Sequence, residues 1–577
     1  MRRADAVACD MRALRAARPN PPLHGEGDRR RRRWGWGVAA PESRVHVRDV
    51  VAPSTTLRVV PLPLRGRILG FALAAFAAPA SATVAPPTHA VPAATLDAAV
   101  AKALPLAQAN DCRSVLALLD PAVAGGAGKG TTGRFTAQLL RLPCLPGAGR
   151  ETEVAPLLAE LRAQAPDNAL IRGYQILDDA DTQHYAQAAD DLAAVADQRS
   201  RALAMIPGDL WRQVSQALTL GNDAPRRDRT ALALALADWD PADRPELAES
   251  LAADGIGLLL DRHALDDARP LLDRIHRPPT LWEMAVERRY AALWPEIEAR
   301  IGPAGGTAID GYARTALDAY ASAPQDGHAL LDATMAFSYL GRFDDVTTTA
   351  AATRIAPGMS EQQVDIVLAD ADAQAAAGHR DAALARLRPF AAADLSTTPE
   401  AAGALIGLAE QLEDAGRYEE ELGVADAGLG TKAAYYSSYG LAWLKRNRVC
   451  ALVGLNRAVD AKAAGDVLKA SASDNQAAAV EGLLCAGREG EAAAIAVTAL
   501  GTTEGADRLA DQFQPEGALL PHAPSHLRTL WAKLLTRSDV KAAFERAARI
   551  LPKPYWPLAT PRALPAPADG GDPSSTT

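Results

Sequence analysis

The chain has 577 residues, of which 48% are hydrophobic, 23% are charged and 5% are aromatic. It is too apolar and too evenly charged to be disordered throughout, and it has no apolar run of the ~18–20 residues that a membrane-spanning helix needs. Because Ala and Leu supply most of the hydrophobicity, the composition favours helices over sheets and predicts an all-α fold.

Charge is distributed unevenly along the chain. Residues 1–67 contain 15 basic and 6 acidic side chains, and the basic ones include the run Arg29–Arg33. Because the whole chain carries a net charge of −9, the remainder carries −18. A strongly acidic main part argues against binding to nucleic acid and to anionic lipid.

A secretory signal peptide is predicted over residues 64–82. Arginines at 65 and 67 precede an apolar run at 68–78, and Ala80-Ser81-Ala82 follows it. A basic segment, an apolar segment and a small-x-small motif are typical of such peptides. We therefore expect cleavage between Ala82 and Thr83 and a periplasmic location, with residues 1–63 as an upstream extension before the true start. The alternative is a genuine basic leader or an uncleaved internal anchor.

The rest of the chain is predicted to be helical, because apolar residues recur at intervals of three and four residues. Gly, Pro, Asp or Asn interrupts this pattern every ten to eighteen residues, where one helix ends and the next begins. The expected segments are a flexible leader at 83–94, an irregular helical-repeat region at 95–320, a clearer repeat region at 321–556 and a disordered tail at 557–577.

Internal repeats are the most informative feature of the sequence. In each repeat an apolar helix is followed by a Gly-centred turn and a second helix. Glycine supplies the left-handed residue that a tight turn between helices needs. Weaker versions of the same turn occur at 110–113, 146–153 and 259–268. The clear turn glycines, spaced by 37, 38, 38 and 33 residues, are Gly341, Gly378, Gly416, Gly454 and Gly487.

The repeats at 323–500 resemble the tetratricopeptide repeat (TPR) family. The turns Leu340–Asp345, Gly416–Glu420 and Gly487–Ala492 are close to the family's turn signature, with Ala492 at the small position where the two helices touch. The period is longer than the family's, and its early Trp and Tyr are mostly absent. The resemblance implies a right-handed α-solenoid that binds a protein or peptide partner.

The cysteines are expected to form two disulfides. Without Cys9, which lies in the leader, four remain, and Cys112–Cys144 and Cys450–Cys485 are separated by 32 and 35 residues, close to one repeat. Each pair can thus bridge equivalent places in neighbouring repeats of an exported protein. The alternative is four separate buried thiols.

No catalytic motif, cofactor motif or metal-ligand spacing occurs in the sequence, so we expect no enzyme activity, cofactor or metal. The densest aromatic cluster is a weak candidate for a partner-binding groove; otherwise its rings pack between helices. Its members are Tyr435, Tyr436, Tyr439 and Trp443.

The preferred function is an exported TPR-like scaffold or adaptor that binds another protein or peptide on a solenoid surface. One alternative is a helical envelope protein that binds or processes polysaccharide, for which paired carboxylates in a deep cleft would be diagnostic. The other is a cytosolic TPR adaptor, should the signal peptide prediction be wrong.

Overall fold

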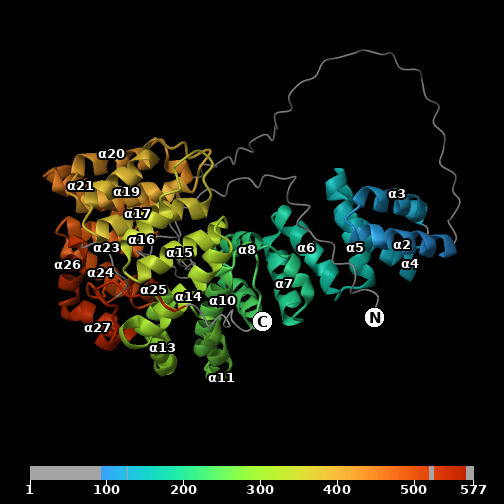
Figure 1. Cartoon of the computed structure of the whole chain (residues 1–577), viewed down its shortest axis with the longest axis horizontal. Coiled ribbons are helices and arrows are strands. Elements are labelled where there is room, and N and C mark those ends of the chain that lie inside the picture. Colours follow the sequence, from blue (N-terminus) through green and yellow to red (C-terminus); the bar gives the residue numbers. More distant parts are fainter. Residues whose placement is uncertain (1–92, 127, 519–524, 567–577) are drawn as a thin grey trace, which may run out of the picture. The chain divides into compact units, whose positions relative to one another are not determined.

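The computed structural model describes residues 93–566 except residue 127 and residues 519–524 (Figure 1). The predicted upstream extension and signal peptide lie outside the described residues, as do most of the flexible leader and the end of the tail. By their contacts the described residues form two compact units, unit 1 (93–167) and unit 2 (168–566). The predicted change of repeat character near residue 320 stays a prediction.

The all-α prediction is confirmed. The described residues form α-helices and short 3-10 helices. The one β-type pairing among them is an isolated antiparallel bridge between Glu287 and Ala548. None of these helices is both long and apolar enough to span a membrane. Local sequence explains where several begin: Asp111, Asn168 and Ser360 accept hydrogen bonds from backbone N–H groups of the first turns that follow them.

Unit 1 is a short helical bundle. Its α-helices are α2 (Ala93–Gln108), α3 (Cys112–Val123), α4 (Thr132–Arg141) and α5 (Val154–Gln164). The disulfide between Cys112 and Cys144 joins the start of α3 to the 3-10 helix η3 (Leu142–Cys144) that follows α4. The first predicted disulfide is therefore confirmed.

Unit 2 begins with helices that lie outside the clear sequence repeats. They are α6 (Ala169–Asp181), α7 (Tyr185–Asp197), α8 (Gly208–Leu220), α9 (Ala224–Leu236), α10 (Glu246–Asp261), α11 (Leu265–Ala268), α12 (Pro278–Val286), η8 (Arg288–Leu293), α13 (Trp294–Ile301) and α14 (Gly306–Ser322).

The predicted repeats form consecutive helix pairs, each packed on the next. The pairs are α15 (Gly327–Tyr339) with α16 (Phe343–Ala350), α17 (Glu361–Ala376) with α18 (Arg380–Leu387), α19 (Ala401–Asp414) with α20 (Tyr418–Leu429), α21 (Ser438–Gly454) with α22 (Ala458–Ala470), and α23 (Gln476–Cys485) with α24 (Glu489–Ala499). The remaining helices are α25 (Thr503–Leu509), α26 (His526–Leu535) and α27 (Ser538–Ala547).

Four of the five predicted turn glycines have the left-handed conformation expected of them. Their φ angles are 69° at Gly341, 87° at Gly378, 69° at Gly416 and 67° at Gly487. The prediction is wrong for Gly454, which ends α21, because Asn456 is the left-handed residue of that turn, with φ 57°.

Gly454 serves packing instead of the turn. A Cβ atom at this position would lie 2.4 Å from the ring of Tyr418, the first residue of α20. The glycine therefore lets α21 approach the preceding helix pair closely.

The second predicted disulfide is also confirmed. Cys450 in α21 is bonded to Cys485 at the end of α23, with the two Cα atoms 5.3 Å apart. It joins the first helices of two successive repeats, as the spacing of about one repeat predicts.

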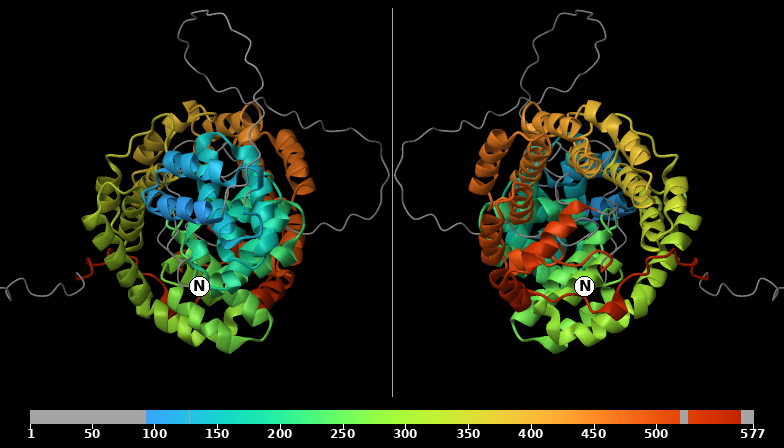
Figure 2. Two further views of the ribbon diagram at one scale, coloured as in Figure 1. Left: turned by 90° about the vertical axis from the view of Figure 1, so that its right-hand side faces the viewer. Right: turned by 90° about the vertical axis from the view of Figure 1, so that its left-hand side faces the viewer.

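The helices of unit 2 from α12 to α27 are arranged around a closed ring (Figure 2). The backbone N–H of Arg549 donates to Val286 O at 2.8 Å, beside the Glu287–Ala548 bridge. Trp282 Nε1 donates to Tyr555 O at 3.3 Å. The segment after α27 thus fastens the end of the repeat array to α12.

Residues 557–566 extend this fastening segment, although the sequence analysis assigned them to the disordered tail. Arg562 donates two hydrogen bonds of 3.0 Å to Asp310 of α14, and its backbone N–H donates to Leu340 O at 2.8 Å. Composition alone suggested disorder because Pro and Ala dominate there, whereas one arginine supplies the specific contacts.

Candidate functional site

A cavity of about 300 Å³ lies inside unit 2, between helices that are far apart in the sequence. Helices α8, α9, α10, α12 and η8 form its wall together with α25. Glu287 both lines this cavity and pairs with Ala548 in the bridge that closes the ring. The shape of the cavity therefore depends on ring closure.

Acidic side chains dominate the cavity. Seven acidic residues and three arginines line it. Arg227 Nη2 lies 2.6 Å from an Asp228 carboxylate oxygen, and Arg289 Nη2 lies 2.9 Å from one of Asp261. Two of the arginines thus have carboxylate partners within the lining, and an excess of negative charge remains, which attracts cations.

Asp254 of α10 is a lining carboxyl with a strongly shifted pKa. Burial raises its pKa to about 7, against the attraction of Arg289 and with added repulsion from Asp507. A carboxyl with this pKa is half protonated in neutral solution. Its charge therefore responds to any cation or proton that enters the cavity.

A glycine in α10 positions the arginine opposite Asp254. The guanidinium of Arg289 lies so close to Gly257 that a Cβ there would be 2.3 Å from Arg289 Cζ. Only a glycine lets the guanidinium lie across the helix backbone at this point. In the sequence Gly257 is one of two glycines in an apolar helix, and nothing in the sequence indicates this contact.

A second charged cluster is fully enclosed between α19, α20, α21 and α23. The Arg446 side chain is 0% exposed and pairs with Glu413 and, at 3.0 Å, with Glu481. Trp531 Nε1 donates to the other oxygen of Glu481 at 3.0 Å. Burial and repulsion from Glu413 raise the pKa of the nearby Glu421 far above its usual range. These contacts hold three repeats together.

The edge of this cluster brings potential metal ligands together. Atoms of Glu413, Cys485 and His526 lie within 4.8 Å of one another, the one such group among the described residues. The sulfur of Cys485 is bonded to Cys450, and His526 Nε2 lies 3.3 Å from Glu413. Hydrogen bonds that the His526 ring donates to Asp414 and Glu413 raise its pKa to about 9, so a protonated imidazole occupies the position. The arrangement fits an ion pair.

The aromatic residues singled out in the sequence pack against the core of unit 2. Tyr436 and Trp443 are buried, and Tyr435 and Tyr439 are partly buried. The rings of Tyr439 and Trp443 meet edge to face with centroids 6.5 Å apart. A role for these four residues in partner binding stays a prediction.

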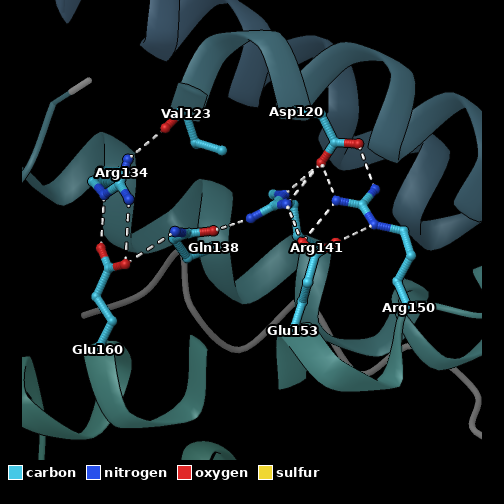
Figure 3. A network of polar contacts seen from close by, with 8 residues as sticks. All are labelled: Asp120, Val123, Arg134, Gln138, Arg141, Arg150, Glu153 and Glu160. Carbon is cyan, nitrogen blue, oxygen red and sulfur yellow. Dashed lines mark hydrogen bonds and ion pairs between the residues drawn. The ribbon is translucent and has the colours of Figure 1, made fainter. Parts of the chain in front are cut away.

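Unit 1 contains a polar network in which the charged groups are mutually paired (Figure 3). Arg150 Nη1 and Arg141 Nη2 lie 2.6 and 2.8 Å from the two oxygens of Asp120. Burial opposes ionisation of Asp120, but the hydrogen bonds from the two arginines prevail and lower its pKa. Similarly, Arg134 Nε donates to Glu160 at 2.6 Å. This network stabilises the bundle.

Comparisons with known proteins do not establish a family for this chain. No family model matches the chain, and no curated protein matches it. Among solved structures it is similar to the crystal structure of the P58(IPK) TPR domain at 13% sequence identity and a TM-score of 0.17, covering 78% of this chain and 98% of that chain.

The fold assignment rests on the chain's own helix pairs. Each clear pair has a short turn with a left-handed residue, and small residues such as Ala492, which is fully buried, lie where the helices touch. Successive pairs pack on each other without intervening sheet in the described residues. The chain is an all-α solenoid of TPR-like repeats.

Proposed function

We propose that this protein is an exported scaffold that binds another protein or peptide, and that the cavity of unit 2 receives part of that partner. The observation that carries the proposal is the cavity itself, which the closed ring assembles from helices of both its ends. Repeat arrays bind extended partners on their inner surfaces, and pockets with a few polar groups provide specificity.

Export is supported by the signal-like sequence at 64–82 and by the two disulfides, since disulfides persist in oxidising compartments. The intact mass of the endogenous protein tests this directly. We expect a chain that begins at Thr83 and has four alkylatable cysteines only after reduction. A longer chain with free thiols would favour the cytosolic adaptor instead.

Partner binding is tested by placing a photo-crosslinking amino acid at Ser250, which lines the cavity, and at Val459, which is 84% exposed on α22. We expect the Ser250 derivative to capture a protein in the envelope and the Val459 derivative to capture none or different ones. Capture from Val459 alone would place the binding surface outside the ring and contradict the proposal.

A second candidate function is polysaccharide processing, and Asp254 favours it. A carboxyl that is protonated near neutral pH in a cavity with other carboxylates has the properties of a general acid for glycoside cleavage. Envelope glycan incubated with the protein distinguishes the two functions. Release of reducing ends that is lost in Asp254→Asn would support the enzyme, whereas no release leaves the binding function.

A further inference from the structure

The ligand chemistry of the cavity follows from three polar groups that the protein leaves unsatisfied. Within the described part of the chain, neither the indole N–H of Trp211 nor the hydroxyl of Tyr290 nor the carboxyl of Asp254 makes a hydrogen bond. Trp211 is 5% exposed and Tyr290 is 7% exposed, and both line the cavity. All three residues line the cavity and none of their polar groups is taken up by a hydrogen bond within the described residues, so a ligand in the cavity can pair with them.

A bound metal ion does not fit this cavity. Among the described residues, the cavity carboxylates do not bring three ligand atoms within 4.8 Å of one another. A volume of about 300 Å³ is also far larger than an ion needs. The negative lining likewise disfavours phosphate, sulfate or a carboxylate as the ligand.

The walls supply what a long cationic side chain requires. Leu251 and Met284 are buried beside the carboxyls and offer apolar surface for a methylene stem. Asp254 accepts a hydrogen bond from an ammonium or guanidinium group. The indole N–H of Trp211 can donate to a carbonyl oxygen of the partner's backbone.

We propose that the cavity is a receptor for a lysine or arginine side chain, which a segment of the partner protein inserts into the ring with Asp254 as its counter-ion. This inference rests on the proposed protein-binding function and names the chemistry that its partner must present. It also assigns a binding role to Asp254 and Tyr290.

The charges that face Asp254 set the pH dependence of binding. Arg289 and Arg227 favour its ionised form, whereas Asp507 and Asp228 oppose it. Because burial holds the pKa near 7, Asp254 becomes fully ionised only above neutral pH. Affinity for a cationic side chain should therefore rise between pH 6 and pH 8, and affinity for a neutral side chain should not.

The experiment uses the full exported chain with its disulfides intact and three small probes. N-acetyl-lysine N-methylamide and N-acetyl-arginine N-methylamide carry the charge, and N-acetyl-norleucine N-methylamide is the neutral control. Saturation-transfer NMR titrations give their affinities. We expect both cationic probes to bind about tenfold or more tightly than the neutral probe.

Two variants locate the binding. Asp254→Asn keeps the shape of the side chain and should lower the affinity for the cationic probes about tenfold and remove the pH dependence. Tyr290→Phe should weaken binding severalfold without altering the pH profile. The control is Asp266→Asn on α11, where the side chain is 98% exposed. Equal binding of all three probes, or unchanged affinity in Asp254→Asn, would overturn the proposal.

The crosslinking experiment at Ser250 separates this inference from the function on which it rests. Protein capture at Ser250 without any preference for cationic probes refutes the basic side chain and leaves the scaffold. Cation binding without protein capture refutes the partner-borne side chain, since the cavity would then serve a free cationic molecule.

Discussion

The guanidinium of Arg549 lies over the indole ring of Trp294, with its central carbon 3.5 Å from the ring centroid. The same side chain donates to Ala285 O at 2.7 Å and to Glu298 at 2.6 Å. Ala285 precedes Arg549 by 264 residues. One arginine thus joins the two ends of the ring.

Replacing Arg549 should open this closure. Arg549→Ala removes a cation–π contact and two hydrogen bonds, so we expect the free energy of unfolding to fall by about 2–4 kcal/mol. Urea denaturation measures it. The control is Arg546→Ala, an exposed arginine on α27, which should change stability by no more than about 0.5 kcal/mol. Equal losses in the two variants would show that Arg549 does not fasten the ring.

The buried cluster around Arg446 should depend strongly on its single cation. Arg446→Met leaves Glu413 and Glu481 buried without their partner, at an expected cost of about 3–5 kcal/mol. Adding Glu413→Gln and Glu481→Gln should restore more than half of this loss, since no uncompensated charge then remains. Arg448→Met, two residues further along α21, removes a partly exposed ion pair with Asp426 and should cost less than about 1 kcal/mol. Denaturant titrations measure the free energy of unfolding of the single, triple and control variants. If the triple variant were no more stable than Arg446→Met, the uncompensated charge would not be the cause of the loss.

Glu421 should make stability fall with rising pH. Because burial and Glu413 raise its folded-state pKa, the folded chain holds a proton that the unfolded chain has lost above its ordinary pKa. Stability from this group is therefore fully present below about pH 4 and is lost as pH rises, by up to about 1.4 kcal/mol per pH unit. Glu421→Gln should remove this slope, so its advantage over the native chain grows from pH 5 to pH 8. Thermal melts from pH 5 to pH 8 test this prediction, with a substitution of the exposed Glu419, Glu419→Gln, as control. If the melting temperatures of the native chain and of Glu421→Gln changed equally with pH, Glu421 would not be the source of the slope.

The disulfide of unit 1 should matter more to that unit than any single ion pair. Replacing Cys112 and Cys144 by serine removes the constraint on a chain segment of 32 residues, at an expected cost of about 3–4 kcal/mol. So small a unit buries little core to offset this loss. Pulse proteolysis with mapped cleavage sites should show new cuts within 93–167 and unchanged protection of 168–566. New cuts confined to unit 2 would contradict the prediction.

The clear repeats were predicted mainly from their turn glycines, whereas turns with another left-handed residue left a weaker signal, as at 259–268, or none. The turns between α6 and α7 and between α8 and α9 use Gln183 and Asn222, with φ of 63° and 56°. His263 has the same role after α10, with φ 58°. Asparagine tolerates this conformation, so its presence at 222 and 456 was a usable signal. Gln183 gave no such indication, whereas the turn around His263 lies within the weaker repeat predicted at 259–268.

The cavity could not be predicted, because its residues meet only through ring closure. In the sequence Asp254 is an ordinary polar residue in an apolar helix, and Asp507 is one acidic residue among many. They influence each other because α10 and α25 both line the cavity. Local periodicity reports which face of a helix is apolar, but it carries no information about which distant helix lies opposite.

Ring closure has a consequence for the order of events during synthesis. Ala285 leaves the ribosome 264 residues before Arg549. At 5–20 residues per second, roughly 13 to 53 seconds pass between them. During that time the end of α12 lacks the segment around Arg549 that binds to it, and the wall of the cavity is incomplete. A nascent chain therefore cannot bind through this cavity until Arg549 and the segment around it have been synthesised.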